Sequence, residues 1–256
     1  MLIGIRSGIL SILFFLAISF GLQAQEEVAK KTKFSVGMGA DFVSSYVWRG
    51  LYQGGASIQP GMTMNVGNFS LIAWGSTDFR GMGTEENPAS KEIDLELSYD
   101  LGDTGLGFVV SDYWWIDKGA GKFFNYKSSE TDHAIEAGIS YALPLDKFPL
   151  SIAWYTFFYG ADKKENGKQN YSSYLELSYP FKVKDIDLEA SFGMSPYASE
   201  YYETSKCGVT NVALKASSSI PLSSKFELPV FVQTVWNPYS EDVHLLLGLS
   251  LSFGDY

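Results

Sequence analysis

Apolar and polar residues alternate without a break between residues 92 and 101. The apolar positions are Ile93, Leu95, Leu97, Tyr99 and Leu101, and the polar positions between them are Glu92, Asp94, Glu96, Ser98 and Asp100. Successive side chains of a β-strand point to opposite faces, so this stretch predicts a strand with one apolar and one acidic face. A soluble sheet would bury the apolar face under a second layer, whereas a membrane barrel would turn it toward lipid.

The same alternation predicts about twelve strands of about ten residues, the length that a tilted strand needs to cross a bilayer. The predicted strands are residues 34–48, 56–64, 69–77, 92–101, 105–117, 133–141, 150–159, 171–179, 186–194, 210–218, 226–236 and 243–253. The pattern is weaker over 69–77, and the phase of 105–117 is ambiguous, because Asp112 shares a face with Phe108 and Val110. A β-bulge near Ser111 would restore the alternation.

Loop length separates the barrel from a soluble sandwich. Connections after odd-numbered strands are mostly long and polar (79–90, 118–131, 161–170, 196–206), and those after even-numbered strands are short (65–68, 101–104, 143–148, 180–185, 220–224). This asymmetry is typical of outer-membrane barrels. Aromatic residues at predicted strand ends fit interfacial girdles, although an ordinary core can be equally aromatic: Tyr46, Trp48, Trp114, Phe158, Tyr171, Tyr179, Trp236 and Phe253. We therefore predict an all-β fold, an antiparallel transmembrane β-barrel with short periplasmic turns and long extracellular loops.

The amino terminus indicates export. Arg6 precedes an apolar run of about a dozen residues (9–20), which suits a signal peptide and is too short for a membrane-spanning helix. A buried amino-terminal helix is the alternative. We predict a signal peptide over 1–24, a short periplasmic tail over 25–33 and the barrel over 34–256. The last strand ends with Phe253 and the chain with Tyr256, close to the pattern that the barrel assembly machinery reads, so outer-membrane lipid and that machinery are the expected partners.

Three motifs carry a resemblance to a known family. They are the run 45–50 (Ser-Tyr-Val-Trp-Arg-Gly) with Gln53, the run 73–76 (Ala-Trp-Gly-Ser) with Asp78 and Phe79, and the run 92–95 (Glu-Ile-Asp-Leu). In these the chain resembles the TorF-type porins of Gram-negative outer membranes, over most of the mature length. It departs from the family at Ala56-Ser57-Ile58, where the family often has a Pro-containing step before a Gln-Gly pair, whereas here Gln59 is followed by Pro60. The family is loosely defined in function, so the resemblance implies a barrel, the outer membrane and diffusion, and no particular substrate.

Charge indicates the nature of the lumen. The net charge of −10 argues against nucleic acid as a partner, because phosphate binding needs clustered Lys and Arg. Carboxylates dominate the predicted inward face, with Arg49 and Lys215 as counter-charges. Either the lumen is wet and open, or these groups form a closed network that plugs it. The predicted pore-lining residues are Asp41, Arg49, Asp94, Glu96, Glu136, Tyr155, Glu176, Glu189, Lys215 and Gln233.

Little in the sequence indicates catalysis. The two histidines are His133, in the lipid-facing phase, and His244, which points inward near Asp242, and no nucleophile motif surrounds a serine. The single Cys207 excludes an intrachain disulfide, and no spacing indicates a bound metal or other cofactor. We expect a protein that is not an enzyme and has no cofactor.

The sequence leaves two functions open. The first is a porin-like barrel in the cell outer membrane that lets small polar or cationic solutes diffuse passively, with Asp94, Glu96 and Glu136 as the best candidates for setting selectivity. The second is a barrel without transport, which serves structural or surface-recognition roles through its extracellular loops. Aromatic residues in the predicted loops, Tyr201, Tyr202 and the 123–126 segment, fit that alternative.

Overall fold

Twelve antiparallel strands form a closed barrel in the computed structural model, which describes residues 33–80, 90–116, 121–145, 148–224 and 226–254. The predicted all-β barrel is confirmed. Its strands are β1 (Phe34–Val43), β4 (Ser57–Val66), β5 (Phe69–Asp78), β6 (Lys91–Asp100), β7 (Leu106–Trp115), β8 (His133–Ala142), β9 (Ser151–Gly160), β10 (Ser173–Val183), β11 (Ile186–Ser195), β12 (Gly208–Ser223), β13 (Phe226–Asn237) and β14 (Asp242–Gly254). The predicted signal peptide lies outside the described residues.

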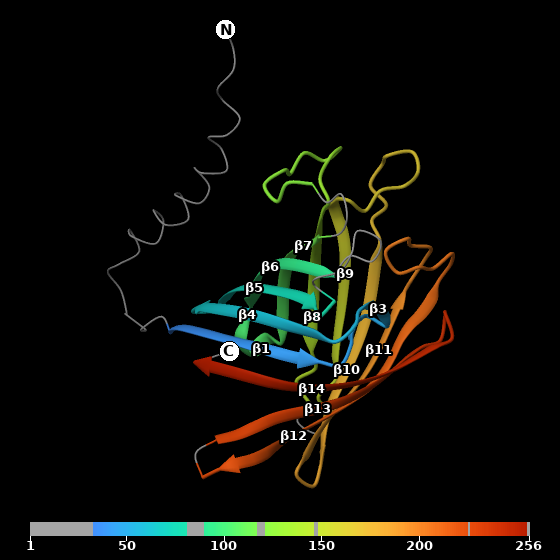
Figure 1. Cartoon of the computed structure of the whole chain (residues 1–256). Helices are drawn as coiled ribbons and strands as arrows, with labels where there is room; N and C mark the ends of the chain where they lie inside the picture. The colour runs from blue at the N-terminus through green and yellow to red at the C-terminus, as the bar shows by residue number, and fades with distance from the viewer. Residues whose placement is uncertain (1–32, 81–89, 117–120, 146–147, 225, 255–256) are drawn as a thin grey trace. The chain divides into compact units, whose positions relative to one another are not determined.

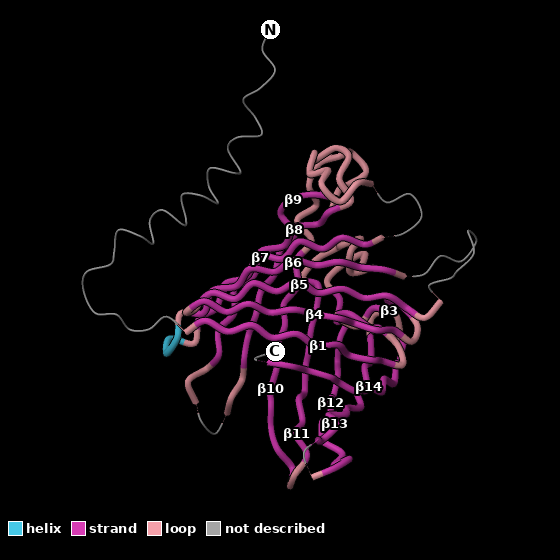
Figure 2. The backbone as a smooth tube through the Cα atoms, turned by 60° about the vertical axis from the view of Figure 1, so that its left-hand side comes forward, coloured by secondary structure: helices cyan, strands magenta, loops and turns pink. Residues whose placement is uncertain are grey.

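Sequential strands pair as neighbours, and the barrel closes where β1 pairs with both β4 and β14. Figure 1 shows the blue β1 beside the red β14. In Figure 2 most of the described chain is strand, joined by loops; a 3-10 turn, η1 (Gly102–Thr104), follows β6. Closure satisfies the backbone polar groups of every strand, so the barrel has no free sheet edge. No described helix is long and apolar enough to cross a membrane.

The strand faces separate apolar from polar residues all round the barrel. Large apolar side chains such as Leu97, Ile139 and Leu247 are exposed on the outer face. Their sequence neighbours, such as Glu96, point inward, because side chains alternate along a strand. An outer surface with this much exposed apolar area is typical of a membrane or partner contact.

The two ends of the barrel differ, and we name them by their connections. The turn end carries the short connections 67–68, 101–105, 143–150, 184–185 and 224–225. The loop end carries 44–56, 79–90, 116–132, 161–172, 196–207 and the shorter 238–241.

The first predicted strand, 34–48, is wrong in its second half. The membrane-length strand β1 ends at Val43, and the chain then forms a separate two-stranded hairpin, β2 (Tyr46–Trp48) and β3 (Leu51–Gly54). The strict alternation ends at Phe42, because Ser44 and Ser45 are both polar and Tyr46, Val47 and Trp48 are all apolar, but no Gly or Pro marks a turn before Gly50, so the sequence alone reads as one strand. We call residues 44–56 the plug hairpin, because its contacts place it inside the lumen.

The apolar core lies around the plug hairpin, inside the barrel. Leu51 packs with lumen-facing Phe157 and Tyr174, and Val47 packs against a cluster of inward residues on β12, β13 and β14. The lumen at the loop end is therefore filled by protein, in place of the uniformly wet interior that one reading of the sequence predicted.

The bulge predicted near Ser111 is wrong. Strand β7 pairs in regular register with β6 and β8 over its whole length, and the nearest irregularity lies between Ile135 and Glu136, where β8 meets β9. Asp112 therefore remains on the outer face near the loop end. It hydrogen-bonds Nδ1 of His133, at 2.8 Å, and the hydroxyl of Tyr126.

His133 is correspondingly not exposed to lipid. Its ring is 1% exposed, and Nε2 lies 2.5 Å from the carbonyl oxygen of Phe123, in the connection between β7 and β8. That connection folds over the outer face of the barrel, so a polar pair sits under protein where the alternation alone placed it against lipid.

Candidate functional site

The tip of the plug hairpin is a two-residue turn, Arg49-Gly50, in which both residues have positive φ (50° and 84°). Such turns match the right-handed twist of the strands they join. The tip touches the wall: a Cβ at position 50 would lie 1.7 Å from the carbonyl oxygen of Thr210 on β12. The side-chain amide of Asn237 donates to the Gly50 carbonyl at 3.2 Å. Glycine is therefore required where the hairpin meets the wall.

Arg49 projects from this turn to the opposite wall and pairs with Glu136 on β8. Nη1 donates to Oε1 at 2.6 Å and Nη2 to Oε2 at 2.9 Å, so the pair is bidentate. The side chains are 8% and 1% exposed. Glu136 also accepts from the hydroxyl of Tyr113 at 3.2 Å. Burying two charges is costly, and this geometry offsets the cost because several donors satisfy the carboxylate.

Aromatic rings enclose the guanidinium on its remaining sides. The guanidinium carbon lies 4.6 Å from the ring centroid of Trp48, 4.4 Å from Tyr155, 4.7 Å from Tyr174 and 5.8 Å from Tyr202. These distances are within the range of cation–π attraction. We call Glu136 and these four aromatic residues the Arg49 cage.

Tyr202 reaches the cage from the connection between β11 and β12. Its side chain is completely buried, and its hydroxyl accepts from Nη1 of Arg49 at 2.6 Å and donates to Oε1 of Glu136 at 3.2 Å. Burial raises the pKa of this hydroxyl; Arg49 opposes the effect and Glu136 adds to it, so the pKa ends well above its ordinary value. The hydroxyl therefore keeps its proton and remains a donor. The prediction that Tyr202 is an exposed loop aromatic is wrong.

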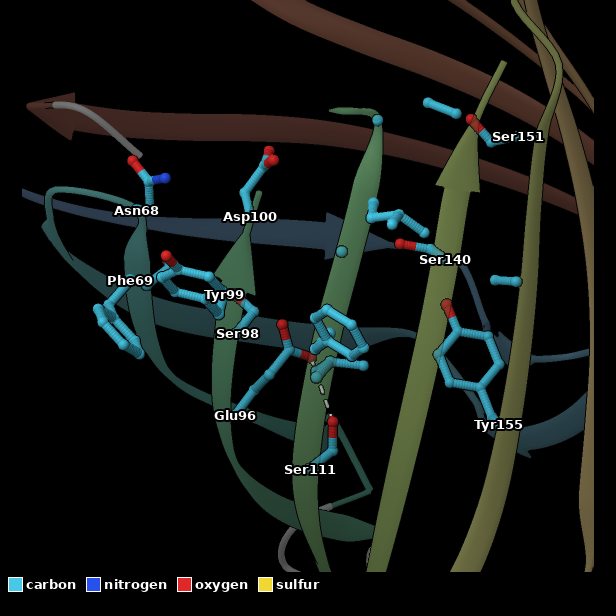
Figure 3. A pocket seen from close by; sticks show the side chains of 18 of the residues that line it. Asn68, Phe69, Glu96, Ser98, Tyr99, Asp100, Ser111, Ser140, Ser151 and Tyr155 are labelled. Atoms are coloured by element: carbon cyan, nitrogen blue, oxygen red, sulfur yellow. Dashed lines mark hydrogen bonds between the residues drawn. The ribbon is translucent and has the colours of Figure 1, made fainter. Parts of the chain in front are cut away.

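A cavity of about 960 Å³, lined by both polar and apolar residues, lies between the cage and the turn end. Arg49, Tyr113 and Tyr155 line it at the cage, and Asn68 and Asp100 line it near the turns. Its wall carries Glu96 and Glu176 among serines: Ser98, Ser111, Ser140, Ser151 and Ser178. Figure 3 shows Glu96 on β6 and Ser111 on β7 pointing toward each other, joined by a hydrogen bond of 3.3 Å, with Tyr155 further round the wall on β9. Such a cavity can hold water and small polar solutes.

The structure brings together five of the residues predicted to line the pore. Arg49, Glu96, Tyr155 and Glu176 line this cavity, and Glu136 is paired with Arg49 directly at its edge. Four of these five come from strands β6, β8, β9 and β10, so one side of the barrel supplies them.

Asp94 lies one step further toward the loop end than Glu96. Its neighbours across the strands are Trp74 and Tyr113, and it is not among the residues that line the cavity. Within the described part of the chain, its Oδ1 atom is buried without a hydrogen-bond partner, as is Oε2 of Glu92. This region is packed beneath the plug hairpin, where Tyr46 contacts Trp74.

The other four predicted residues face a different part of the lumen. Glu189, Lys215 and Gln233 are neighbours across β11, β12 and β13, and Asp41 lies on β1 opposite Gln59. The Lys215 ammonium lies 4.4 Å from the ring centroid of Phe231, not near the cage. It lines a second cavity of about 450 Å³ with Asp187. One reading of the sequence placed both Arg49 and Lys215 in a network that plugs the lumen. The structure places Arg49 in such a network with Glu136, but Lys215 lies outside it.

Sequence reasoning missed Trp48, Tyr174 and Tyr202 as site residues. Tyr174 shares the inward phase of Glu176, which is a usable signal. Trp48 precedes the Arg-Gly turn, which was taken as the end of a long strand. No local signal marks Tyr202, because the hydrogen bonds of its side chain, to Arg49 and Glu136, are both long-range.

The described residues also bear on metal binding and on the inward histidine. They contain no group of three or more His, Cys, Asp or Glu side chains that could hold a metal ion. His244, the inward histidine, stacks on Tyr52 of the plug hairpin with ring centroids 6.1 Å apart.

Comparison with known proteins gives matches at the level of structure. No family model matches the chain, and no curated protein does. An outer membrane channel from Pseudomonas putida F1 matches with a TM-score of 0.45 and 10% identity, over 90% of this chain and 100% of that one. OprB from Pseudomonas putida matches with a TM-score of 0.34 and 8% identity, over 92% and 97% of the two chains. A bacterial polysaccharide outer membrane secretin matches with a TM-score of 0.38 and 8% identity, over 89% and 99%.

Proposed function

We propose that the protein is a porin-like barrel of the outer membrane that lets small polar or cationic solutes diffuse passively. One observation carries the proposal: a cavity of about 960 Å³, with the carboxylates of Glu96 and Glu176 and several serines on its wall, lies inside a closed barrel whose outer face is apolar. A wet, acidic lumen inside an apolar exterior is the arrangement of a transmembrane barrel that conducts. The TorF-type resemblance of the sequence points the same way.

Strand length and surface support the location. The barrel strands have 10 to 16 residues, enough to cross a bilayer at a tilt. Phe69 is exposed at the turn end of β5, and Trp236 is exposed near the loop end of β13. Interfacial girdles of aromatic residues lie at these two levels of a membrane barrel. Outer-membrane lipid, the barrel assembly machinery and small solutes are the partners that this proposal implies.

The plug hairpin sets the limit on diffusion. It meets wall residues of β8, β9, β10 and β12, so it crosses the lumen at the loop end. Solutes in the cavity would pass only beside the hairpin or when its tip leaves the wall. We therefore expect low conductance that rises when the tip is displaced.

The same hairpin favours the alternative, a barrel without transport that acts structurally or through its loops. The buried, bidentate Arg49–Glu136 pair keeps the lumen closed, and a folded barrel of this kind can be stable without ever opening a path for solutes. In that case displacing the hairpin tip would destabilise the barrel without opening a path for solutes.

Single-channel recording in planar bilayers distinguishes the two functions. The unmodified protein is compared with Gly50→Ala, whose new Cβ would collide with the Thr210 carbonyl. The matched control is Gly167→Ala, which also has positive φ (75°) but no atom within 4 Å of the new Cβ. We expect small conductance steps in the unmodified protein and in Gly167→Ala, and larger steps in Gly50→Ala. Absence of conductance in all three folded proteins would support the alternative.

A further inference from the structure

We propose that the Arg49 cage is a binding site for guanidinium groups that the chain's own Arg49 occupies, and that guanidinium-bearing solutes in the lumen compete for it. The inference deepens the proposed function, on which it rests for the route by which a solute arrives. It names a solute class and the residues that would recognise it.

The chemistry of the cage matches one cation type. Oε1 and Oε2 of Glu136 accept two parallel N–H donors at 2.6 and 2.9 Å, which a planar guanidinium supplies and an ammonium does not. The faces of Tyr155 and Tyr174 lie 4.4 and 4.7 Å from the guanidinium carbon, so the cation is also held by ring faces. An ammonium ion would satisfy the charge, but it cannot present two parallel N–H donors in the fixed planar geometry that the Glu136 carboxylate accepts.

Most of the cage belongs to the barrel wall and not to the hairpin. Glu136, Tyr155 and Tyr174 are on β8, β9 and β10, and Tyr202 is held by its own connection through a hydrogen bond from its backbone N–H to Ser199. Only Trp48 arrives with the hairpin. Withdrawal of Arg49 would therefore leave a preformed carboxylate flanked by three tyrosines.

The cage is reachable from the cavity. Arg49 and Tyr155 line the 960 Å³ space directly, together with Glu96 and Glu176. Carboxylates on the walls of a narrow cavity raise the local concentration of cations. A cationic solute that enters from the turn end would meet the cage as the next binding group along its path.

The tethered Arg49 acts as an intramolecular competitor. A tethered group has an effective concentration in the millimolar range or higher, so free guanidinium compounds should bind the unmodified protein weakly. Removal of the Arg49 side chain should expose the site.

Rescue by a small guanidinium compound tests the inference. Purified Arg49→Ala in detergent is heated with and without about 10 mM methylguanidinium, and the conversion of the folded, heat-modifiable band is followed on gels. We expect the midpoint to rise by at least about 3 °C, because a ligand that binds only the folded state stabilises it. Methylammonium should need about tenfold more for the same effect, since it cannot form the paired hydrogen bonds.

Two variants keep the result specific. Arg49→Ala/Glu136→Gln should show no rescue, because the carboxylate is gone. Lys215→Ala, which removes a lumen cation outside the cage, should show none either. If Arg49→Ala does not fold alone, the yield of folded band on refolding with methylguanidinium replaces the midpoint. Equal effects of methylguanidinium and methylammonium, or no effect on Arg49→Ala, would overturn the inference.

The readout needs no conduction. A barrel that fails to conduct but shows rescue keeps the guanidinium site and loses the proposed function. A barrel that conducts without rescue keeps the proposed function and loses the site.

Discussion

Single residues explain why the plug hairpin can sit inside the barrel. Gly50 lets the tip approach the β12 backbone more closely than any side chain would allow, and the neighbouring Arg49 adopts φ of 50°, which costs about 1 kcal/mol for a non-glycine residue. That cost is offset by the ion pair with Glu136 and by the rings around the guanidinium. The two turn residues thus hold the hairpin tip in the lumen, and the packing of Val47 and Leu51 against the wall holds its strands there.

The Arg49–Glu136 pair should therefore dominate stability among the ion pairs of the described residues. Glu136→Gln leaves Arg49 buried without a full counter-charge, and we expect a loss of about 3–5 kcal/mol in the free energy of unfolding. The measurement is denaturant-induced unfolding of the protein in lipid vesicles.

The control for this prediction is Asp187→Asn. Asp187 pairs with Lys182 at 3.0 Å, but the two side chains are 67% and 59% exposed. An exposed pair contributes no more than about 1 kcal/mol, so the control should change little. Losses of equal size in the two variants would contradict the dominant role of the cage.

At the scale of elements, the strands and the connections follow different rules. Barrel strands are specified by a period of two, and each one predicted from the sequence has a counterpart in the structure. Connections are specified by what they pack against. The 44–56 and 196–207 connections both enter the lumen, whereas the tip of the 161–172 connection is exposed.

The 161–172 connection is therefore the best place to test the orientation in the membrane. Asn166 is exposed, and Gly167 beside it has no atom within 4 Å of its Cβ position, so an insertion there removes only local turn contacts such as the hydrogen bond from the Lys168 N–H to Asn166. We expect a short tag at Asn166 to be labelled on intact cells. A tag at Lys184, in the tight turn between β10 and β11 at the opposite end, should be labelled only after permeabilisation. The reverse pattern would invert the assignment of the two ends.

The whole molecule places its charges unevenly. Of the inward carboxylates, Glu136 is paired with Arg49, while Glu96 and Glu176 line the cavity. A narrow lumen with carboxylates on its wall strengthens their field and favours cations. The cationic Lys215 lies elsewhere and does not neutralise these two groups.

If the barrel conducts, it should prefer cations, and Glu96→Gln/Glu176→Gln should lower that preference. Reversal potentials across a potassium chloride gradient measure it. Glu165→Gln, which removes an exposed carboxylate in the 161–172 connection, is the control and should leave the preference unchanged. Anion preference in the unmodified protein would contradict the assignment, and the effect should shrink at high salt because salt screens the charges.

The sequence by itself determined the barrel, the number of its strands and the sorting of its connections by length. These properties are local: alternation decides which face of each strand is apolar, and strand length decides whether it can cross a bilayer. The inward positions of Glu96, Glu136, Tyr155 and Glu176 follow from the same period of two.

Only the tertiary structure decided what fills the lumen. Strand alternation says that Glu136 points inward but not that Arg49, 87 positions earlier, reaches it across the barrel. The end of β1 at Val43, the entry of Tyr202 and the separation of Lys215 from the cage likewise depend on contacts between distant segments. Such contacts arise because a closed barrel brings eight or more strands around one space, and the side chains that meet there have no fixed separation in the sequence.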